Sequence, residues 1–238
     1  MAKAFTTWKV LGHEPLVELA ENLWWVRGSL PGMSLKRVMT VVRLSDGRLV
    51  VHNAMALDED SMRRLEAWGK PSVMLVPSAM HRLDARAYKQ RYPDMTVYAP
   101  AGARQAVSDV VALDGAFEDF SPLPELSLET LSGVASAEGA MVVKSSDGTT
   151  VVLNDALFNM DKKKDLLGYL FTALMGSAPG PRVSRLARLL LVKDRKALRR
   201  DFERFAALAD LVRLIVAHEK VASGPDARQA LLQAAEYL

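Results

Sequence analysis

Cysteine is absent from this chain of 238 residues, and its absence excludes disulfides, thiolate metal sites and cysteine nucleophiles. Any metal site must therefore be built from histidine, aspartate and glutamate. No run approaches the roughly 20 apolar residues that cross a bilayer. Residues 1–16 also lack the continuous apolar core of a secretory signal, so we expect a cytoplasmic protein.

Two motifs of nucleotide and ester chemistry are missing as well. No glycine-rich phosphate loop and no Gly-x-Ser-x-Gly nucleophile elbow occurs in the sequence. Half of the residues are apolar and a quarter are charged, which is ordinary globular composition. Because no stretch rich in proline, glycine or serine marks a linker, we expect residues 1–238 to form a single domain.

The most informative feature is an internal repeat. Residues 41–55 (VVRLSDGRLVVHNAM) and 142–156 (VVKSSDGTTVVLNDA) match at 8 of 15 positions, with the turn glycines Gly47 and Gly148 lying 101 residues apart. Each segment is typical of a β-hairpin, because valine-rich strands flank an Asp-Gly pair that supplies the positive φ of a tight turn. Two unrelated hairpins would also look this similar. The repeat predicts two packed sheets related by two-fold symmetry, with any chemistry where the strands end.

Strands and helices alternate around these hairpins. Strands are predicted over 16–28 in two pieces, 72–76, 95–99, 126–130 and 212–217, and helices over 57–69, 85–91, 103–109, 183–192, 194–211 and 225–238. The strand, helix and strand over 72–99 indicate parallel neighbours in a sheet. With helices covering both outer faces of two packed sheets, we predict a four-layer αββα sandwich of the α+β or α/β class.

A helical insertion, about residues 158–210, precedes the late strand. Residues 161–204 carry 12 lysines and arginines against 5 aspartates and glutamates, a net charge of +7. Such a segment can attract phosphate, nucleic acid or an anionic membrane, although a solvated helix face is the commoner meaning. Because no aromatic stacking platform or recognition motif lies beside it, we do not expect nucleic acid as a partner.

Within the insertion, residues 166–176 (LLGYLFTALMG) are apolar all round and have basic flanks. The flanking cations are Lys162 to Lys164, Arg182, Arg185 and Arg188. One interpretation is peripheral contact of residues 162–188 with a membrane surface or a partner, since the stretch is too short to span a bilayer. The commoner interpretation is a buried core helix, or a lid over the strand ends.

Three of the four histidines lie at or just after predicted strand ends: His52, His81 and His218. Asp155 ends the second hairpin, where the first has Ala54. Strand ends facing a crevice are where α/β folds place binding groups, and neutral imidazole with carboxylate suits Zn, Fe(II) or Mn(II). Taken singly, each residue also fits a structural role, as a hydrogen-bonded histidine or an aspartate that closes a turn.

The order of these features resembles the metallo-β-lactamase superfamily over nearly the whole chain, from about Val17 to Leu238. In that family a strand ends in a Thr-His-x-His-x-Asp-His loop, a Gly-His turn precedes a second hairpin, a Gly-Asp supplies a bridging carboxylate, and a late strand ends in the last histidine ligand. The corresponding segments here are VPSAMHRLDA, LSGVASAEGAMVV, VVLNDALF and LIVAHEKVAS. Asp155 matches the bridging carboxylate, and His218 matches the last histidine.

The remaining ligands of the family's binuclear site do not match. With Pro77 at the threonine position, the four loop ligands become Ser78, Met80, Arg82 and Leu83. A shift of one residue aligns His81 with the second histidine but puts Ala79, Leu83 and Asp84 at the other places, and Val134 stands at the histidine of the Gly-His turn. The chain resembles an uncharacterised branch with Pro-Asn-x-x-His in this loop and a helical insertion before the late strand; PSAMH at 77–81 has Ser78 in place of the asparagine.

The resemblance implies a metallo-β-lactamase-like fold and leaves two functions open. In the first, the ordinary binuclear site is lost and the chain is a non-hydrolytic ligand-binding or regulatory module for a small or anionic molecule, its ligand-binding candidates being Arg82, His52, Ser78 and Asn154. Arg82 favours this function, because a fixed cation repels a divalent metal and can hold an anion.

The second function is that of a mononuclear hydrolase. One Zn, Fe or Mn on His81, Asp155 and His218 would serve an ester, lactone, thioester or phosphoester substrate, with Asp155 and His218 as the best catalytic candidates. Two histidines and one carboxylate are also the ligand set of non-haem Fe(II) oxygenases. β-Lactamase activity of the ordinary binuclear type is not expected under either function.

Overall fold

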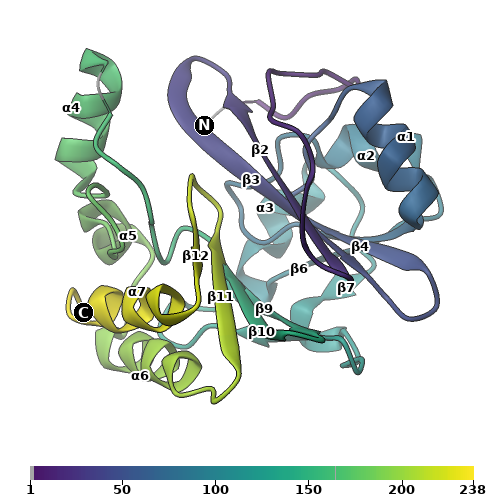
Figure 1. Cartoon of the computed structure of the whole chain (residues 1–238). Coiled ribbons are helices and arrows are strands. Elements are labelled where there is room, and N and C mark those ends of the chain that lie inside the picture. The colour runs from purple at the N-terminus through teal and green to yellow at the C-terminus, as the bar shows by residue number, and fades with distance from the viewer. Residues whose placement is uncertain (1–2, 164) are drawn as a thin grey trace.

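Two β-sheets packed face to face form the centre of the computed structural model, which describes residues 3–163 and 165–238 (Figure 1). The first sheet has seven strands in the order β1-β2-β3-β4-β5-β6-β7: β1 Val17–Ala20, β2 Leu23–Leu30, β3 Met33–Arg43, β4 Arg48–His52, β5 Lys70–Leu75, β6 Thr96–Ala99 and β7 Gly115–Ala116. The second has five in the order β12-β11-β10-β9-β8: β8 Leu126–Thr130, β9 Gly139–Ser145, β10 Gly148–Leu153, β11 Leu211–Val216 and β12 Val221–Ser223.

The helices lie outside these two sheets. They are α1 Glu59–Trp68, α2 Ala85–Arg91, α3 Arg104–Ser108, α4 Leu166–Met175, α5 Arg185–Leu190, α6 Arg195–Ala206 and α7 Pro225–Ala235, with short 3₁₀ turns over Ala101–Ala103 and Phe117–Asp119. In Figure 1, α1 and α2 stand on the right against the first sheet, and α6 and α7 stand at lower left against the second.

Three separate hydrophobic clusters correspond to the three interfaces of a four-layer sandwich. Val50 and Val152 belong to the cluster between the sheets. Val51 packs in the cluster beneath α1 and α2, and Val151 packs in the one beneath α6 and α7. Alternate residues of each central strand thus face opposite layers, as a pleated strand requires. The predicted αββα arrangement is confirmed.

Both hairpins of the repeat are present, but their registers differ by one residue. Gly47 and Gly148 have the expected positive φ, at 83° and 136°. In the first hairpin Arg43 pairs with Leu49, whereas in the second Ser145 pairs with Gly148. Because a one-residue slip turns every side chain to the other face, Val50 lies between the sheets while its counterpart at the 101-residue offset, Val151, faces outward.

The parallel pairing predicted over residues 72–99 is confirmed by β5 and β6, and most helix boundaries are confirmed as well. Strands β4, β5 and β6 are parallel neighbours, as are β10 and β11. Asp58 caps α1 by accepting from the Ser61 amide, and the helix ends at Gly69 as predicted. Helix α2 covers the predicted residues 85–91. The carboxyl ends of parallel neighbours lie at one edge of each sheet, which is where the polar residues were expected.

Three boundaries in the second half of the chain were wrong or missed. Helix α6 ends at Ala206 rather than 211, because Leu211 pairs with Thr149 and begins β11. Strand β12 was not predicted, and it pairs with β11 over only three residues. The stretch 113–124, where no strand or helix was predicted, contains β7 and a 3₁₀ turn. Short edge elements carry too few residues for a periodic signal.

The core interpretation of the apolar stretch 166–176 is also wrong. It does form a helix, α4, but the side chains of Leu166 and Leu174 are 79% and 63% exposed. Lys164, one of the predicted flanking cations, lies outside the described residues. Among the helices that the structure describes, none has the length and apolar character needed to cross a membrane.

Candidate metal centre

Three of the predicted ligand residues meet at the strand ends. His81 Nε2 and His218 Nε2 each lie 3.1 Å from the same oxygen, Oδ1 of Asp155. The three ligand atoms all lie within 4.8 Å of one another. The side chains of His81, Asp155 and His218 are 7%, 22% and 9% exposed, so the cluster is shielded but reachable at the carboxylate.

Strand pairing explains why Asp155 and His218 are neighbours. Leu153 pairs with Val216 at the ends of the parallel strands β10 and β11, and each polar residue follows its strand by two positions. The first sheet joins them there, because the Val38 amide on β3 donates to the Ala217 carbonyl. Residues far apart in sequence are thus held at one edge of the sandwich.

The loop after β5 brings His81 to this edge. The His81 amide donates to the Ser78 carbonyl, and the Ser78 hydroxyl accepts from the Met80 amide. The buried Ser78 is therefore part of a tight turn rather than a free group in a cleft. Its predicted ligand-binding role remains a prediction.

The second nitrogen of His218 determines its tautomer. His218 Nδ1 lies 2.8 Å from the carbonyl oxygen of Lys36, which can only accept, so Nδ1 carries a hydrogen. Nε2 then faces the Asp155 carboxylate with a lone pair unless it binds a second proton. Two acceptors at 3.1 Å repel each other, so this geometry calls for a cation between them, either a proton or a metal. The Phe158 ring stacks parallel on the imidazole, with centroids 5.5 Å apart.

The electrostatics of the cluster favour a carboxylate facing positive charge. Burial alone would raise the pKa of Asp155, but His81 and His218 hold it well below its usual range. Burial opposes protonation of His218, yet the hydrogen bond and the charge of Asp155 leave its pKa raised. Asp155 thus stays ionised, and the cluster attracts either a proton or a metal cation.

The two nitrogen-to-oxygen distances of the cluster suit one metal ion. In a tetrahedral zinc site with bonds of about 2.0–2.1 Å, two ligand atoms lie roughly 3.3–3.4 Å apart. The two nitrogen-to-oxygen distances of 3.1 Å are within a few tenths of an ångström of that value. The hydrogen bond from His218 Nδ1 to a backbone carbonyl is the outer contact that metal-binding histidines usually make.

Sequence reasoning missed Glu138, which holds the segment carrying Asp155. Its side chain is buried and accepts hydrogen bonds from the Asp155 and Ala156 amides, at 3.2 and 2.8 Å. Burial, and then the negative charge of Asp155, raise the pKa of Glu138 well above its usual value. A carboxylate just before the apolar strand β9 was a signal that could have found it. No sequence signal points to the Lys36 carbonyl, since every residue has one.

His52 ends β4 and Asn154 follows β10, and both residues are buried. Burial, and secondarily the charge of His81, lower the pKa of His52 to about 3, so this histidine is neutral. Its Nε2 and both amide atoms of Asn154 have no hydrogen-bond partner among the described residues. Neither residue is at the surface, and their predicted role in ligand binding stays a prediction.

The Arg82 side chain makes a structural contact with α3. Its guanidinium donates to the Ala106 carbonyl on α3, which anchors the loop of His81 to that helix. Other positions that hold ligands in the family also have structural roles here. Leu83 and Asp84 of the loop are buried, Asp84 in an ion pair with Arg37, and Val134 of the Gly-His turn is buried.

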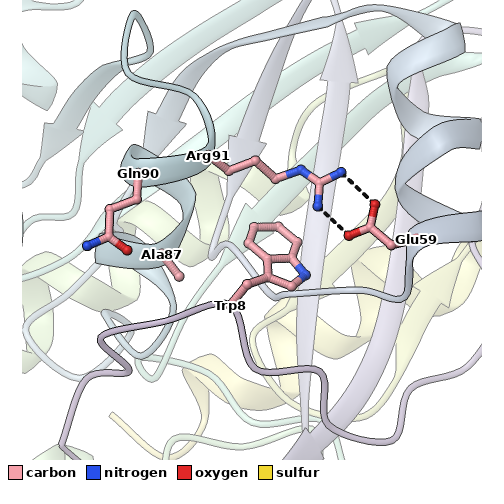
Figure 2. Close-up of a pocket in the computed structure, with 5 residues that line it drawn as sticks. All are labelled: Trp8, Glu59, Ala87, Gln90 and Arg91. Atoms are coloured by element: carbon pink, nitrogen blue, oxygen red, sulfur yellow. Dashed lines mark hydrogen bonds and ion pairs between the residues drawn. The ribbon is translucent and has the colours of Figure 1, made fainter.

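Two recesses in the surface lie away from the cluster. Figure 2 shows the first, of about 290 Å³, where Arg91 stacks over Trp8 and pairs with both oxygens of Glu59. Glu66 also contacts Arg91, so its charge is already compensated. The second recess, of about 480 Å³, lies beside β12 and α7. Neither recess is lined by His81, Asp155 or His218.

Comparison with known proteins identifies the fold. No protein-family model matches the chain, and no curated protein matches it. Among solved structures, a metallo-β-lactamase from Erythrobacter litoralis, with β-mercaptoethanol in its active site, has a TM-score of 0.62 at 16% identity, covering 94% of this chain and 96% of that one. TMB-1 has a TM-score of 0.61 at 12% identity, covering 95% and 98%. The metallo-β-lactamase DIM-1, in crystals exposed to ceftazidime, has a TM-score of 0.62 at 10% identity, covering 96% and 98%. The chain therefore has a metallo-β-lactamase-like fold.

Proposed function

We propose that this protein binds a single divalent metal ion through His81 Nε2, Asp155 Oδ1 and His218 Nε2. The observation that carries the proposal is the approach of two imidazole nitrogens to one carboxylate oxygen at 3.1 Å, with His218 Nδ1 already committed to a backbone carbonyl. A set of two nitrogens and one oxygen suits Zn, Fe(II) or Mn(II).

Neighbouring residues preorganise the ligand side chains of this site without a bound ion. Lys36 orients His218 through its carbonyl oxygen, and Glu138 holds the backbone of Asp155 in place. Phe158 covers one face of the His218 ring and keeps water from it. Side chains held in this way lose little freedom on binding, which favours affinity.

We extend the proposal to hydrolysis of an ester, lactone, thioester or phosphoester. A divalent ion held by three protein ligands supplies Lewis acidity and activation of water, because a coordination position remains open. The partial exposure of Asp155 supports access for a substrate. The metallo-β-lactamases with the same fold support this class of reaction by analogy alone.

A single ion is favoured over a pair by the side chains around the cluster. Leu83 and Val134 are apolar and buried, and Asp84 is paired with Arg37. Two of these positions offer no ligand atom, and the third is already held in an ion pair. These contacts support a site that lacks the second metal of the ordinary family arrangement.

The competing function is a metal-free module that binds a small or anionic molecule. One observation favours it: the pKa of His218 is raised by Asp155, and a protonated His218 satisfies the carboxylate without any metal. In that case the cluster is a buried ion pair, and the fold serves as a binding scaffold.

Metal content measured by elemental mass spectrometry distinguishes the two functions. Untagged protein, purified without chelator, is compared with His81→Ala, His218→Ala and the control His13→Ala, which removes a histidine bonded to Asp58 far from the cluster. We expect about one Zn, Fe or Mn per chain in the wild type and the control, and loss in both cluster variants. Wild-type protein that takes up none of these ions on incubation would refute the proposal and leave the metal-free module.

A further inference from the structure

The exposed apolar side chains of this protein are concentrated in the helical insertion. Of the twelve large apolar side chains that are exposed among the described residues, seven lie between positions 166 and 190: Leu166, Tyr169, Leu170, Leu174, Leu186, Leu189 and Leu190. Scattered exposed leucines need no explanation, but a concentrated patch marks a contact surface. We call residues 162–190, with α4 and α5, the insertion surface.

Among the described side chains of α4, two small buried residues lie opposite a row of exposed leucines. Gly168 and Thr172 are buried, and a Cβ atom at Gly168 would lie 2.4 Å from the Ser34 hydroxyl at the start of β3. Leu166, Leu170 and Leu174 follow one another at every fourth residue on the opposite side, so they form one stripe. In Figure 1, α4 and α5 stand on the left, on the side of the molecule opposite α1 and α2.

Positive charge borders this apolar face. None of the ten residues of α4 is charged. Lys162 precedes the helix, Arg185 begins α5, and Lys193, Arg195 and Lys196 follow α5; all five are exposed, and none forms an ion pair within the described part of the chain. The acidic residues nearby are engaged: Asp165 and Asp194 cap α4 and α6, and Asp161 pairs with Lys220.

We propose that the insertion surface docks onto the anionic face of a phospholipid bilayer, with α4 lying in the plane of the interface. Long aliphatic side chains enter the boundary between headgroups and acyl chains, Tyr169 sits at headgroup level, and the bordering cations contact lipid phosphates and carboxylates. Ten residues of helix reach only about 15 Å, so α4 lies on the membrane and does not cross it.

The composition of the face favours lipid over a protein partner. Protein interfaces draw most of their affinity from tryptophan, tyrosine and arginine in central pockets, and leucine is under-represented among such residues. Six of the seven exposed large apolar side chains of the insertion surface are leucines, and its exposed cations, Lys162 and Arg185, lie outside α4. This inference is independent of the proposed metal site.

Vesicle flotation of the untagged full chain tests the docking. Vesicles of phosphatidylcholine, with and without phosphatidylserine, are compared at low and high salt. We expect partitioning at low salt to be at least about tenfold stronger with phosphatidylserine, because each lysine or arginine near an anionic surface contributes about 1 kcal/mol. High salt should weaken it by screening.

Paired variants separate docking from nonspecific binding. Leu170→Glu/Leu174→Glu should reduce partitioning at least about tenfold, since it puts two charges into the buried face. Leu232→Glu is the matched control, because Leu232 is also exposed, at 46%, but lies on α7. Lys193→Glu/Lys196→Glu should remove most of the preference for phosphatidylserine while leaving the apolar face intact. Circular dichroism establishes that each variant is folded.

Four outcomes would overturn the proposal. They are absence of binding to phosphatidylserine vesicles at low salt, equal binding to neutral vesicles, and binding that is unchanged by Leu170→Glu/Leu174→Glu. In the fourth, the wild type does not bind vesicles but self-associates, as measured by sedimentation without lipid, and Leu170→Glu/Leu174→Glu abolishes that self-association. That result would assign the surface to a second copy of the chain.

Discussion

Breaking the buried ion pair between Arg37 and Asp84 should destabilise the protein far more than breaking an exposed pair of the same kind. The two side chains are 3% and 0% exposed. Removing one partner leaves an uncompensated charge in the interior, which costs about 3–5 kcal/mol. In a chain of this size each kcal/mol corresponds to roughly 2–4 °C, so Arg37→Met or Asp84→Leu should lower Tm by roughly 6–20 °C.

Replacing both partners should cost less than the sum of the single changes. Arg37 Nε and Nη2 have no hydrogen-bond partner among the described residues, so the wild-type pair carries unsatisfied polar groups. Burial raises the pKa of Asp84 even though Arg37 opposes the shift, which indicates that the carboxylate is incompletely compensated. The variant Arg37→Met/Asp84→Leu removes these groups together, and we expect it to be more stable than either single variant.

Denaturant unfolding of the four proteins in this cycle gives the coupling free energy. Asp60→Asn is the matched control, because it breaks an exposed Arg–Asp pair. In that pair the side chains of Arg63 and Asp60 are 69% and 87% exposed. That change should cost less than about 1 kcal/mol. Additive losses in the double variant, or single-variant losses no larger than the control's, would refute the reasoning that burial decides the effect.

The same pair should also affect the candidate metal centre. Asp84 lies three residues after His81, and Arg37 follows Lys36, whose carbonyl oxygen orients His218. Loss of the pair frees both segments, so Arg37→Met should weaken metal binding measured by titration calorimetry. Asp60→Asn should leave it unchanged.

Three further predictions concern stability. His52 has a pKa of about 3 in the folded chain and 6.5 in the unfolded chain. Between these pH values the unfolded chain binds more protons than the folded chain does. The free energy of unfolding should therefore fall by about 1.4 kcal/mol per pH unit as the pH drops below 6.5. Unfolding at several pH values checks this, and His52→Leu should flatten the slope. Zinc at 100 times its Kd should stabilise the wild type by about 2.7 kcal/mol in thermal unfolding, and Asp155→Asn should lose that gain. Gly133→Ala should lower the free energy of unfolding more than Gly32→Ala does. Both glycines have positive φ, at 75° and 68°, but only at Gly133 would an added Cβ meet backbone, 2.1 Å from the Asp194 carbonyl oxygen. A loss of stability beyond about 2 kcal/mol in Gly32→Ala would contradict the comparison.

Local signals in the sequence were sufficient for most of the elements. The Asp-Gly pairs at 46–47 and 147–148 determined two hairpins because only a residue tolerant of positive φ can close such turns. Asp58 and Gly69 bounded α1 because a helix end needs partners for its free amides and carbonyls. The placement of polar residues at strand ends predicted that His52, His81, Asp155 and His218 would converge, and the family resemblance singled out the last three, which do meet.

Contacts across the sandwich decided what the sequence left open. Leu166, Leu170 and Leu174 indicate an apolar helix, but only the packing of Gly168 on β3 shows that their side faces outward. The repeat does not reveal the slip that turns Val50 inward and Val151 outward, because turn geometry sets the register.

For the chemistry of the cluster too, part can be predicted from the sequence and part depends on the tertiary structure. The residue types Asp and His, and their positions after β10 and β11, can be read from the sequence by itself. The tautomer of His218 depends on the carbonyl oxygen of Lys36, 182 residues away in the chain, and on a hydrogen bond of 2.8 Å. A backbone carbonyl leaves no mark in the amino-acid sequence, so only the packing of the two sheets could place it there.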